Sequence, residues 1–181
     1  MSDVKEIEVK ARVQNVDELL RKIEELGVTF GSTLTQYDRV FLPNGTTIKE
    51  ITAGVSALRI RIENGSKTIF TLKQRQNVEL SAIEAEVEIV DGESLPALIQ
   101  LLGYYEVLSI HKKRRKAEYK EYEICLDEVE GLGSFIEIQK FSSEDGEKIQ
   151  NELFDFLKQF GIKDSDRERK GYDTLIDEKK I

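Results

Sequence analysis

The chain has 181 residues, of which 39% are hydrophobic and 34% are charged, and its formal net charge is −8. These values are typical of a globular protein with one sizeable core, and the acidic balance argues against general binding of nucleic acid. The single cysteine, Cys125, excludes an internal disulfide. No apolar run approaches membrane-spanning length and no signal peptide opens the chain, so we expect a cytoplasmic protein with no membrane partner.

The first predicted strand alternates charged and aliphatic residues. In the segment of residues 6–10, Glu6, Glu8 and Lys10 share one face and the aliphatic residues share the other. Two carboxylates two residues apart can hold a hard divalent cation, and the lysine beside them can bind phosphate as a point charge. Taken alone, this strand is better explained as a solvated face above a buried one.

A repeat of the strand-then-helix pattern organises the chain. Residues 6–10 are followed by helical spacing over residues 15–27, and the acidic strand of residues 84–88 is followed by helical spacing over residues 91–103. Each helix is expected to end at its final glycine. The segment from Pro43 to Gly54 has no clear periodicity and is predicted to be a mobile loop.

The strands after these two glycines carry polar residues at matching offsets. Gln36 and Asp38 follow Gly27 by nine and eleven residues, and Lys112 and Arg114 follow Gly103 by the same intervals. Each half then adds a hairpin, over residues 57–73 with an Asn-Gly turn and over residues 122–139. We therefore predict one domain, residues 1–181, built from two β-α-β-β-β halves. The halves span about residues 1–78 and 79–141, and a helix from about 143 to 160 and a polar tail complete residues 142–181.

The charged faces of these strands are continuous over about eight strands, while the predicted helices supply apolar stripes for the other face. A sheet of this size tends to curl, and closing it removes its edges. We predict an α+β fold in which a closed antiparallel β-barrel carries helices outside and charged residues inside. Because buried charge is costly unless it is paired or binds a charged ligand, clustered carboxylates suggest a divalent metal and clustered basic residues suggest phosphates.

The motifs in this order resemble the CYTH superfamily, also called triphosphate tunnel metalloenzymes, over nearly the whole chain. The family's E-x-E-x-K opening stands at residues 6–10, its R-x-R strand at residues 59–61 and its second E-x-E at residues 84–86. A late block with the pattern D-E-V-E-G-L-G-x-F-x-E-I spans residues 127–138. The family's K-x-R strand fits best as Lys112 and Arg114, and the register of Lys113 and Arg115 is the alternative.

The resemblance implies roles for individual residues. Triphosphate binding is implied for Lys10, Arg59, Arg61, Lys73, Lys112 and Arg114. Binding of Mg²⁺ or Mn²⁺ is implied for Glu6, Glu8, Glu84, Glu86 and Glu137. The candidate catalytic residues are Lys10, Lys73 and Asp127. The chain departs from the family at Gln139, where a second glutamate is usual, and this removes a possible metal ligand.

The resemblance is greatest to class IV adenylyl cyclases, which implies conversion of ATP to cyclic AMP and pyrophosphate. Two alternatives stay open: a triphosphatase acting on thiamine triphosphate or inorganic tripolyphosphate, and a non-catalytic binder of nucleotide or polyphosphate. In each case the partner is a small-molecule triphosphate, and the protein is expected to be a monomer or a homodimer. The residues that match the family motifs would bind the triphosphate, and they do not indicate which organic group the substrate carries.

Overall fold

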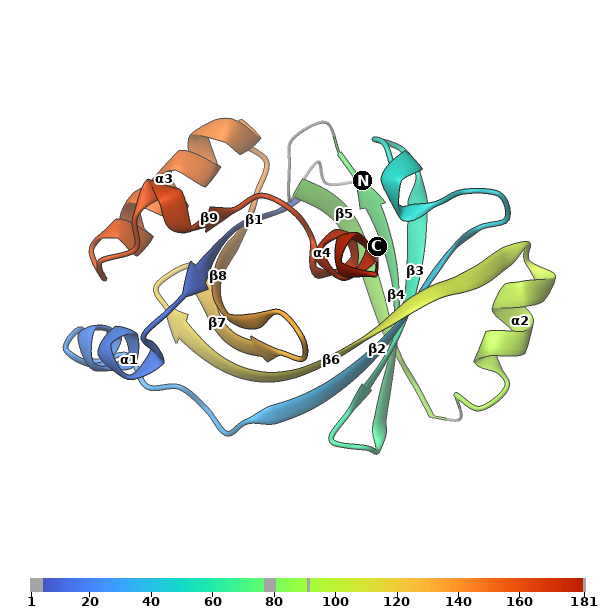
Figure 1. Ribbon diagram of the computed structural model, residues 1–181, viewed down its shortest axis with the longest axis horizontal. Helices are drawn as coiled ribbons and strands as arrows, with labels where there is room; N and C mark the ends of the chain where they lie inside the picture. Colours follow the sequence, from blue (N-terminus) through green and yellow to red (C-terminus); the bar gives the residue numbers. More distant parts are fainter. Residues whose placement is uncertain (1–4, 77–80, 91, 181) are drawn as a thin grey trace. The chain divides into compact units, whose positions relative to one another are not determined.

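The period-two pattern of the sequence forms long strands in a computed structural model that describes residues 5–76, 81–90 and 92–180 (Figure 1). By their contacts these residues fall into two units, one comprising the chain up to Leu34 with Lys113–Arg169, the other Thr35–Lys112 with the chain from Lys170. The units do not follow the halves of the sequence repeat, since each takes residues from both halves.

The first unit is a curved antiparallel sheet with two helices. Its strands lie in the order β7-β8-β1-β9, after the second part of β6, and β1 pairs with β8 from Lys5 opposite Ser142 to Val13 opposite Ser134. Its elements are β1 (Lys5–Val13), α1 (Val16–Glu24), β6 (Tyr104–Tyr119, shared with the second unit), β7 (Tyr122–Val129), β8 (Gly133–Ser142), α3 (Gly146–Lys158), the 3₁₀ helix η2 (Asp164–Asp166) and β9 (Arg167–Glu168).

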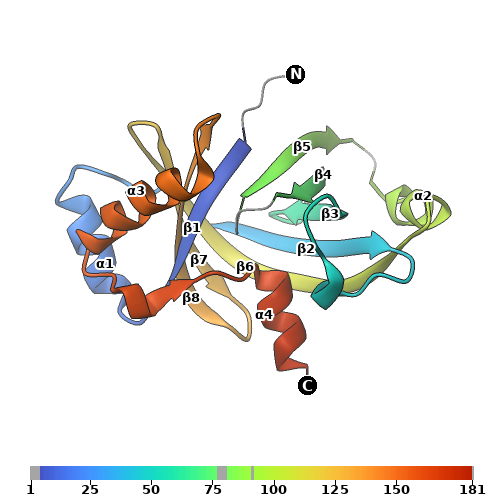
Figure 2. The same ribbon diagram turned by 90° about the horizontal axis from the view of Figure 1, so that it is seen from above.

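Helices α1 and α3 cover the aliphatic face of this sheet, as Figures 1 and 2 show. Asn15 caps α1 by accepting a hydrogen bond from the amide of Glu18, and Asp145 caps α3 in the same way. Ile23 of α1 and Leu153 of α3 are fully buried in one core with the alternate aliphatic residues of β1, β7 and β8. The predicted helical cover is therefore present on this unit, and the charged residues of the same strands face the other way.

The second unit has the strand order β5-β4-β3-β2-β6, again antiparallel wherever a register is defined. The predicted Asn-Gly hairpin joins β3 to β4, with positive φ angles of 49° at Asn64 and 71° at Gly65. Its elements are β2 (Leu34–Pro43), the 3₁₀ helix η1 (Ile48–Glu50), β3 (Ser56–Glu63), β4 (Lys67–Arg75), β5 (Ser81–Ile89), α2 (Leu95–Leu101) and α4 (Tyr172–Lys179).

The aliphatic face of the second unit is covered less completely. Ile99 of the seven-residue helix α2 packs on Phe41, Leu58 and Ile60 of β2 and β3 (Figure 2). Phe70 of β4 packs against this cluster, whereas the face of β5 is more open, and Val87 is 53% exposed. Because α2 has only seven residues, it leaves part of the aliphatic face of β5 uncovered.

The segment predicted to be a loop without structure is partly ordered. It contains η1, where the side chain of Glu50 accepts hydrogen bonds from the amide and hydroxyl of Thr47. Ile48 and Ile51 are buried, so this segment contributes to the packing of the second unit. Within the described residues, no helix is both long enough and apolar enough to cross a membrane.

Candidate functional site

The polar face of the first unit is a grid of ionisable side chains set by the strand register. Lys10 of β1 lies opposite Glu137 of β8, and Glu137 lies opposite Cys125 of β7. In the next row Glu8 lies opposite Gln139. Side chains directly opposite on one face of a sheet are close neighbours, so the strand pairing alone brings these groups together.

Lys10 stands between two carboxylates. Its Nζ atom is 3.1 Å from Oε1 of Glu137 and 3.6 Å from Oε1 of Glu8, and its side chain is 2% exposed. An ammonium group as buried as this is stable only with opposite charge at hand. The two glutamates therefore already hold a cation in common, and that cation is the lysine of the same strand.

Arg114 of β6 binds Asp127 of β7 through both arms of its guanidinium group. Nε and Nη2 donate hydrogen bonds of 2.6 and 2.5 Å to the two oxygens of Asp127, and Nη2 also donates to Glu137. Burial alone would lower the pKa of Arg114, but the negative charges around it, of which Asp127 contributes most, raise its pKa well above the usual value. Arg114 thus stays charged and fixed in orientation.

Cys125 lies on this face without the properties of a nucleophile. The residue is fully buried, and burial raises the pKa of its thiol to about 12. The thiolate is the reactive form of cysteine, and a pKa this high leaves almost none at neutral pH. Cys125 therefore fills space between charged neighbours.

In the second unit Arg61 of β3 makes the matching buried pair with Asp38 of β2. Nε and Nη2 of Arg61 each donate a hydrogen bond of 2.7 Å to one oxygen of Asp38. Burial raises the pKa of Asp38, but the hydrogen bonds and charge of Arg61 outweigh it, so the net effect is a pKa well below the usual range. The pair is charged at neutral pH.

Two further basic residues of this unit have acidic partners on β5. Arg59 Nη2 donates a 2.8 Å hydrogen bond to Glu86, which also accepts one from the hydroxyl of Thr71. Lys73 Nζ lies 2.5 Å from Glu84. The side chains of Lys73 and Arg59 are 35% and 22% exposed, so this part of the polar face is more open to a ligand than the Arg61–Asp38 pair.

The first residues of the C-terminal helix α4 contact this unit. The ring of Tyr172 lies 5.1 Å from Nζ of Lys112, a cation–π contact, and Asp173 accepts a 3.0 Å hydrogen bond from Arg75. Tyr172 and Leu175 are buried. The tail of the chain thus reaches one of the basic residues predicted to bind phosphate.

The structure places the predicted site residues as follows. Lys112 and Arg114 are buried on the polar faces, whereas Lys113 is exposed and makes a 3.8 Å contact with the exposed Glu128 on the other face of the strands. The first unit carries Glu6, Glu8, Lys10, Arg114, Asp127 and Glu137, and the second carries Arg59, Arg61, Lys73, Glu84, Glu86 and Lys112.

The carboxylates have the right chemistry for a divalent cation, since Mg²⁺ and Mn²⁺ prefer oxygen ligands. As arranged here they are engaged by lysine and arginine. Within residues 5–76, 81–90 and 92–180, no group of three or more histidine, cysteine, aspartate or glutamate side chains is gathered for metal binding. The donor chemistry fits, and a metal would have to replace basic partners such as Lys10.

Sequence reasoning did not assign Asp38 or the Arg75–Asp173 pair to the site. Asp38 had a signal, because its offset from Gly27 equals that of Arg114 from Gly103. An aspartate and an arginine at matching positions of a repeat require partners of opposite sign on the neighbouring strands. The Arg75–Asp173 contact had no comparable signal, since nothing in the sequence specifies which strand Asp173 meets.

A protein-family model described as the CYTH domain matches residues 4–172. This chain belongs to the CYTH family. A Methanocaldococcus jannaschii protein named "putative adenylate cyclase" is 30% identical over 170 residues, which cover 92% of this chain and 95% of that protein.

Solved structures of the CYTH type agree with this assignment. The Pyrococcus horikoshii protein PH1819 is 33% identical with a TM-score of 0.81, covering 96% of this chain and 99% of its own. A Hippeastrum protein, described as a "putative adenylyl cyclase" with a dominant triphosphatase activity, is 21% identical with a TM-score of 0.61, covering 93% of this chain and 91% of its own. The predicted fold, an α+β closed antiparallel barrel of eight strands, is confirmed.

We predict that Asp38→Asn lowers the free energy of unfolding at pH 7 by about 3–5 kcal/mol, because Arg61 stays buried without its counter-charge. The pKa of Asp38 is lowered in the folded state, so its contribution is present above the pKa of an unfolded aspartate, about 3.9, and is lost as the pH falls below that value. The difference between wild type and variant should therefore shrink from pH 4 toward pH 2.

Urea unfolding over this pH range measures the effect. Asp155→Asn is the matched control, because Asp155 pairs with Lys158 at 3.3 Å on the exposed surface, and surface pairs contribute about 0–1 kcal/mol. Equal losses in the two variants would show that the Asp38–Arg61 pair contributes no more than a surface contact.

Proposed function

We propose that this CYTH protein is a divalent-metal-dependent enzyme that acts on a nucleoside or other organic triphosphate. The observation that carries the proposal is the array of basic side chains on the polar faces of both units, of which Lys10, Arg59 and Lys73 lie beside carboxylates that an incoming ligand can replace. Basic groups distributed over many strands suit a chain of phosphates better than a single anion.

The more exposed residues would receive the substrate. Arg59 and Lys73 exchange contacts with Glu86 and Glu84 for contacts with phosphate oxygens, since both pairs are partly open to solvent. Arg61 and Arg114 keep their aspartates and serve as fixed positive charges, each on the polar face of its own unit. Positioning and electrostatic stabilisation by such preorganised groups supply most of the catalysis in phosphoryl transfer.

Lys10 would couple the binding of a metal to the binding of a phosphate. Its ammonium occupies the space between Glu8 and Glu137 that a cation bound by those carboxylates would share. A divalent ion held there would offset the developing charge on phosphate oxygens. Displaced from its two glutamates, Lys10 becomes available to a phosphate, so metal and substrate would bind cooperatively. Glu6, Glu84 and Glu86 supply further carboxylates, and Asp127 orients Arg114.

The cyclase is our first candidate for the reaction, on the strength of the 30% identity to a protein named as an adenylate cyclase. A cyclase positions a ribose hydroxyl against the α-phosphorus, whereas a triphosphatase delivers water to the terminal phosphorus. The triphosphatase is the second candidate, because no described residue of the polar faces is an obvious partner for a base or ribose. A non-catalytic binder of polyphosphate is the third.

A panel of substrates separates these three candidates. ATP, GTP, thiamine triphosphate and tripolyphosphate are incubated with Mg²⁺ or Mn²⁺, and the products are separated by anion-exchange chromatography. We expect turnover that disappears on chelation of the metal. Cyclic AMP with pyrophosphate identifies the cyclase, orthophosphate identifies the triphosphatase, and binding without turnover identifies the binder. Neither binding nor turnover of any of these triphosphates would refute the proposal.

We predict that Lys73→Gln lowers the affinity for tripolyphosphate about tenfold or more, because a hydrogen bond to a charged group contributes about 1.5–3 kcal/mol. The affinity for AMP should change less, since its single phosphate makes fewer contacts with the basic side chains of the site. Lys67→Gln is the matched control: Lys67 is on the same strand, has a glutamate partner on β5 at 3.3 Å and loses the same charge. Competition binding measures both, and equal effects of the two variants would remove Lys73 from the site.

Tyr172 is predicted to hold Lys112 in position for the triphosphate. Tyr172→Leu removes the ring and should raise KM a few-fold to about thirtyfold, the range of a cation–π contact, with a smaller effect on kcat. Tyr172→Phe keeps the ring over Nζ of Lys112 and should retain nearly the wild-type KM. Steady-state kinetics with thermal unfolding as a stability check test this, and a Phe variant as impaired as the Leu variant would contradict it.

A further inference from the structure

The basic run of β6 serves two faces, and only one of them belongs to the proposed triphosphate site. Residues 112–116 read Lys-Lys-Arg-Arg-Lys, and a strand sends alternate residues to opposite sides. Lys112 and Arg114 are buried on the polar faces, so Lys113 and Arg115 project from the outer surface. The proposed reaction gives these outer basic residues no role.

Lys113 and Arg115 border a cavity of about 250 Å³ in the first unit. Thr33, from the segment before β2, and Ser134, at the start of β8, bring hydroxyl groups to the same cavity, and Leu126 gives it an apolar wall. Hydroxyl, ammonium and guanidinium groups are all donors to anionic oxygen. This volume is below the roughly 300–1,000 Å³ of pockets for drug-sized ligands, so a small anion fits better than a nucleotide.

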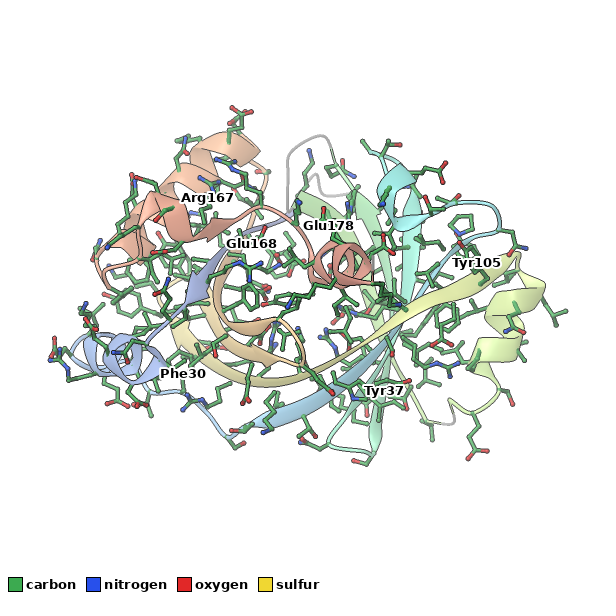
Figure 3. The ribbon with its side chains drawn as sticks, in the orientation of Figure 1. Phe30, Tyr37, Tyr105, Arg167, Glu168 and Glu178 are labelled. Carbon is green, nitrogen blue, oxygen red and sulfur yellow. The ribbon has the colours of Figure 1, made fainter. Side chains whose placement is uncertain are left out.

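Arg115 is the feature that indicates a ligand. Within the part of the chain that the structure describes, its guanidinium has no ion pair or hydrogen bond, although it is only partly exposed. Its one recorded contact is with the ring of Phe30, whose centroid is 5.8 Å away; Figure 3 labels Phe30 near α1. The planar donor edge of a guanidinium group that no carboxylate engages matches two oxygens of a phosphate.

Two carboxylates also border the cavity, and they affect it differently. Asp127 is 1% exposed and is bound by Arg114 on the polar face. Glu128 is exposed, lies opposite Ser134 in the β7–β8 register and meets Lys113 at 3.8 Å. A 3.8 Å contact between two well-exposed side chains is weak, so an anion could take the place of Glu128 beside Lys113.

We propose that this outer cavity is a second anion site, separate from the triphosphate site, for orthophosphate or pyrophosphate. Arg115 and Lys113 bind the phosphate oxygens, Thr33 and Ser134 donate hydrogen bonds, and Glu128 competes with the ligand. The proposal does not depend on which reaction the protein catalyses, because none of these side chains is assigned to the proposed reaction.

Titration of the ¹⁵N-labelled full chain with pyrophosphate, and separately with orthophosphate, at constant ionic strength tests the site. The amide signals of Thr33 and Ser134 report the outer cavity, and those of Thr71 and Lys73 report the triphosphate site. We expect Arg115→Gln to weaken the affinity reported by Thr33 and Ser134 about tenfold, and Glu128→Gln to strengthen it several-fold, because these changes remove a ligand and a competitor respectively.

Arg21→Gln is the matched control, since Arg21 is an exposed arginine of the same unit and the change removes the same charge. It should leave the affinity at the outer cavity unchanged, and Lys73→Gln should change only the signals of the triphosphate site. Opposite effects of Arg115→Gln and Glu128→Gln would support the proposal. If pyrophosphate and orthophosphate leave Thr33 and Ser134 unperturbed, or if both variants behave like Arg21→Gln, the outer site does not exist, whatever the substrate panel shows.

Discussion

The need to neutralise buried charge determines how this protein is built. The polar faces of its two units bury Lys10, Arg61, Asp38, Arg114 and Asp127, and a single unpaired ion in such a place would cost several kcal/mol. Pairing removes most of that cost without making the site inert. A carboxylate that holds an arginine in the resting protein keeps the guanidinium charged, oriented and stripped of water, which is the condition in which it binds phosphate well.

The two halves of the sequence repeat both neutralise buried charge with an arginine–aspartate pair. The acidic residue comes first along the chain in one half, and the basic residue comes first in the other. Asp38 and Arg114 occupy matching offsets after Gly27 and Gly103, and each forms a two-pronged ion pair with a residue of the next strand, Arg61 in one case and Asp127 in the other. The geometry of the pair is kept while donor and acceptor exchange strands. Such an exchange conserves the local charge balance, so it costs little stability, and it changes which strand presents the guanidinium to a ligand.

The faces of the strands could be predicted from the sequence because they depend only on a period of two. Glu84 and Glu86, or Lys112 and Arg114, had to share a face once the strands were recognised, and the structure places them so. The pairing of residues between strands was harder to predict from the sequence, because it depends on register. Asp38 lies opposite Arg61 because of the length of the connection between β2 and β3. The register of the basic run came from the resemblance to the CYTH family, in which the interval between the arginine and the later aspartate favours Lys112 and Arg114, and the structure buries both.

Other features of the structure could not be predicted from the sequence, and the physical reasons can be identified. The helical spacing over residues 91–103 gave a helix, but only seven residues form α2, and this leaves Val87 exposed on a strand expected to be covered. The segment after Pro43 lacks periodicity because a 3₁₀ helix is too short to show any, yet Ile48 and Ile51 anchor it. Long-range contacts such as that of Tyr172 with Lys112 join segments sixty residues apart, and composition carries no record of them.

The alternation that defines the polar face also constrains what the other face can do. Arg114 lies between Lys113 and Arg115, and Asp127 lies between Leu126 and Glu128, so the strands that hold the Arg114–Asp127 pair on one side form the outer cavity on the other. An anion bound in the outer cavity would attract the side chains of Lys113 and Arg115. These residues are the neighbours of Arg114 on the same strand. The Arg114–Asp127 pair, with hydrogen bonds of 2.6 and 2.5 Å, is therefore the part of the polar face that lies on the same two strands as the outer cavity.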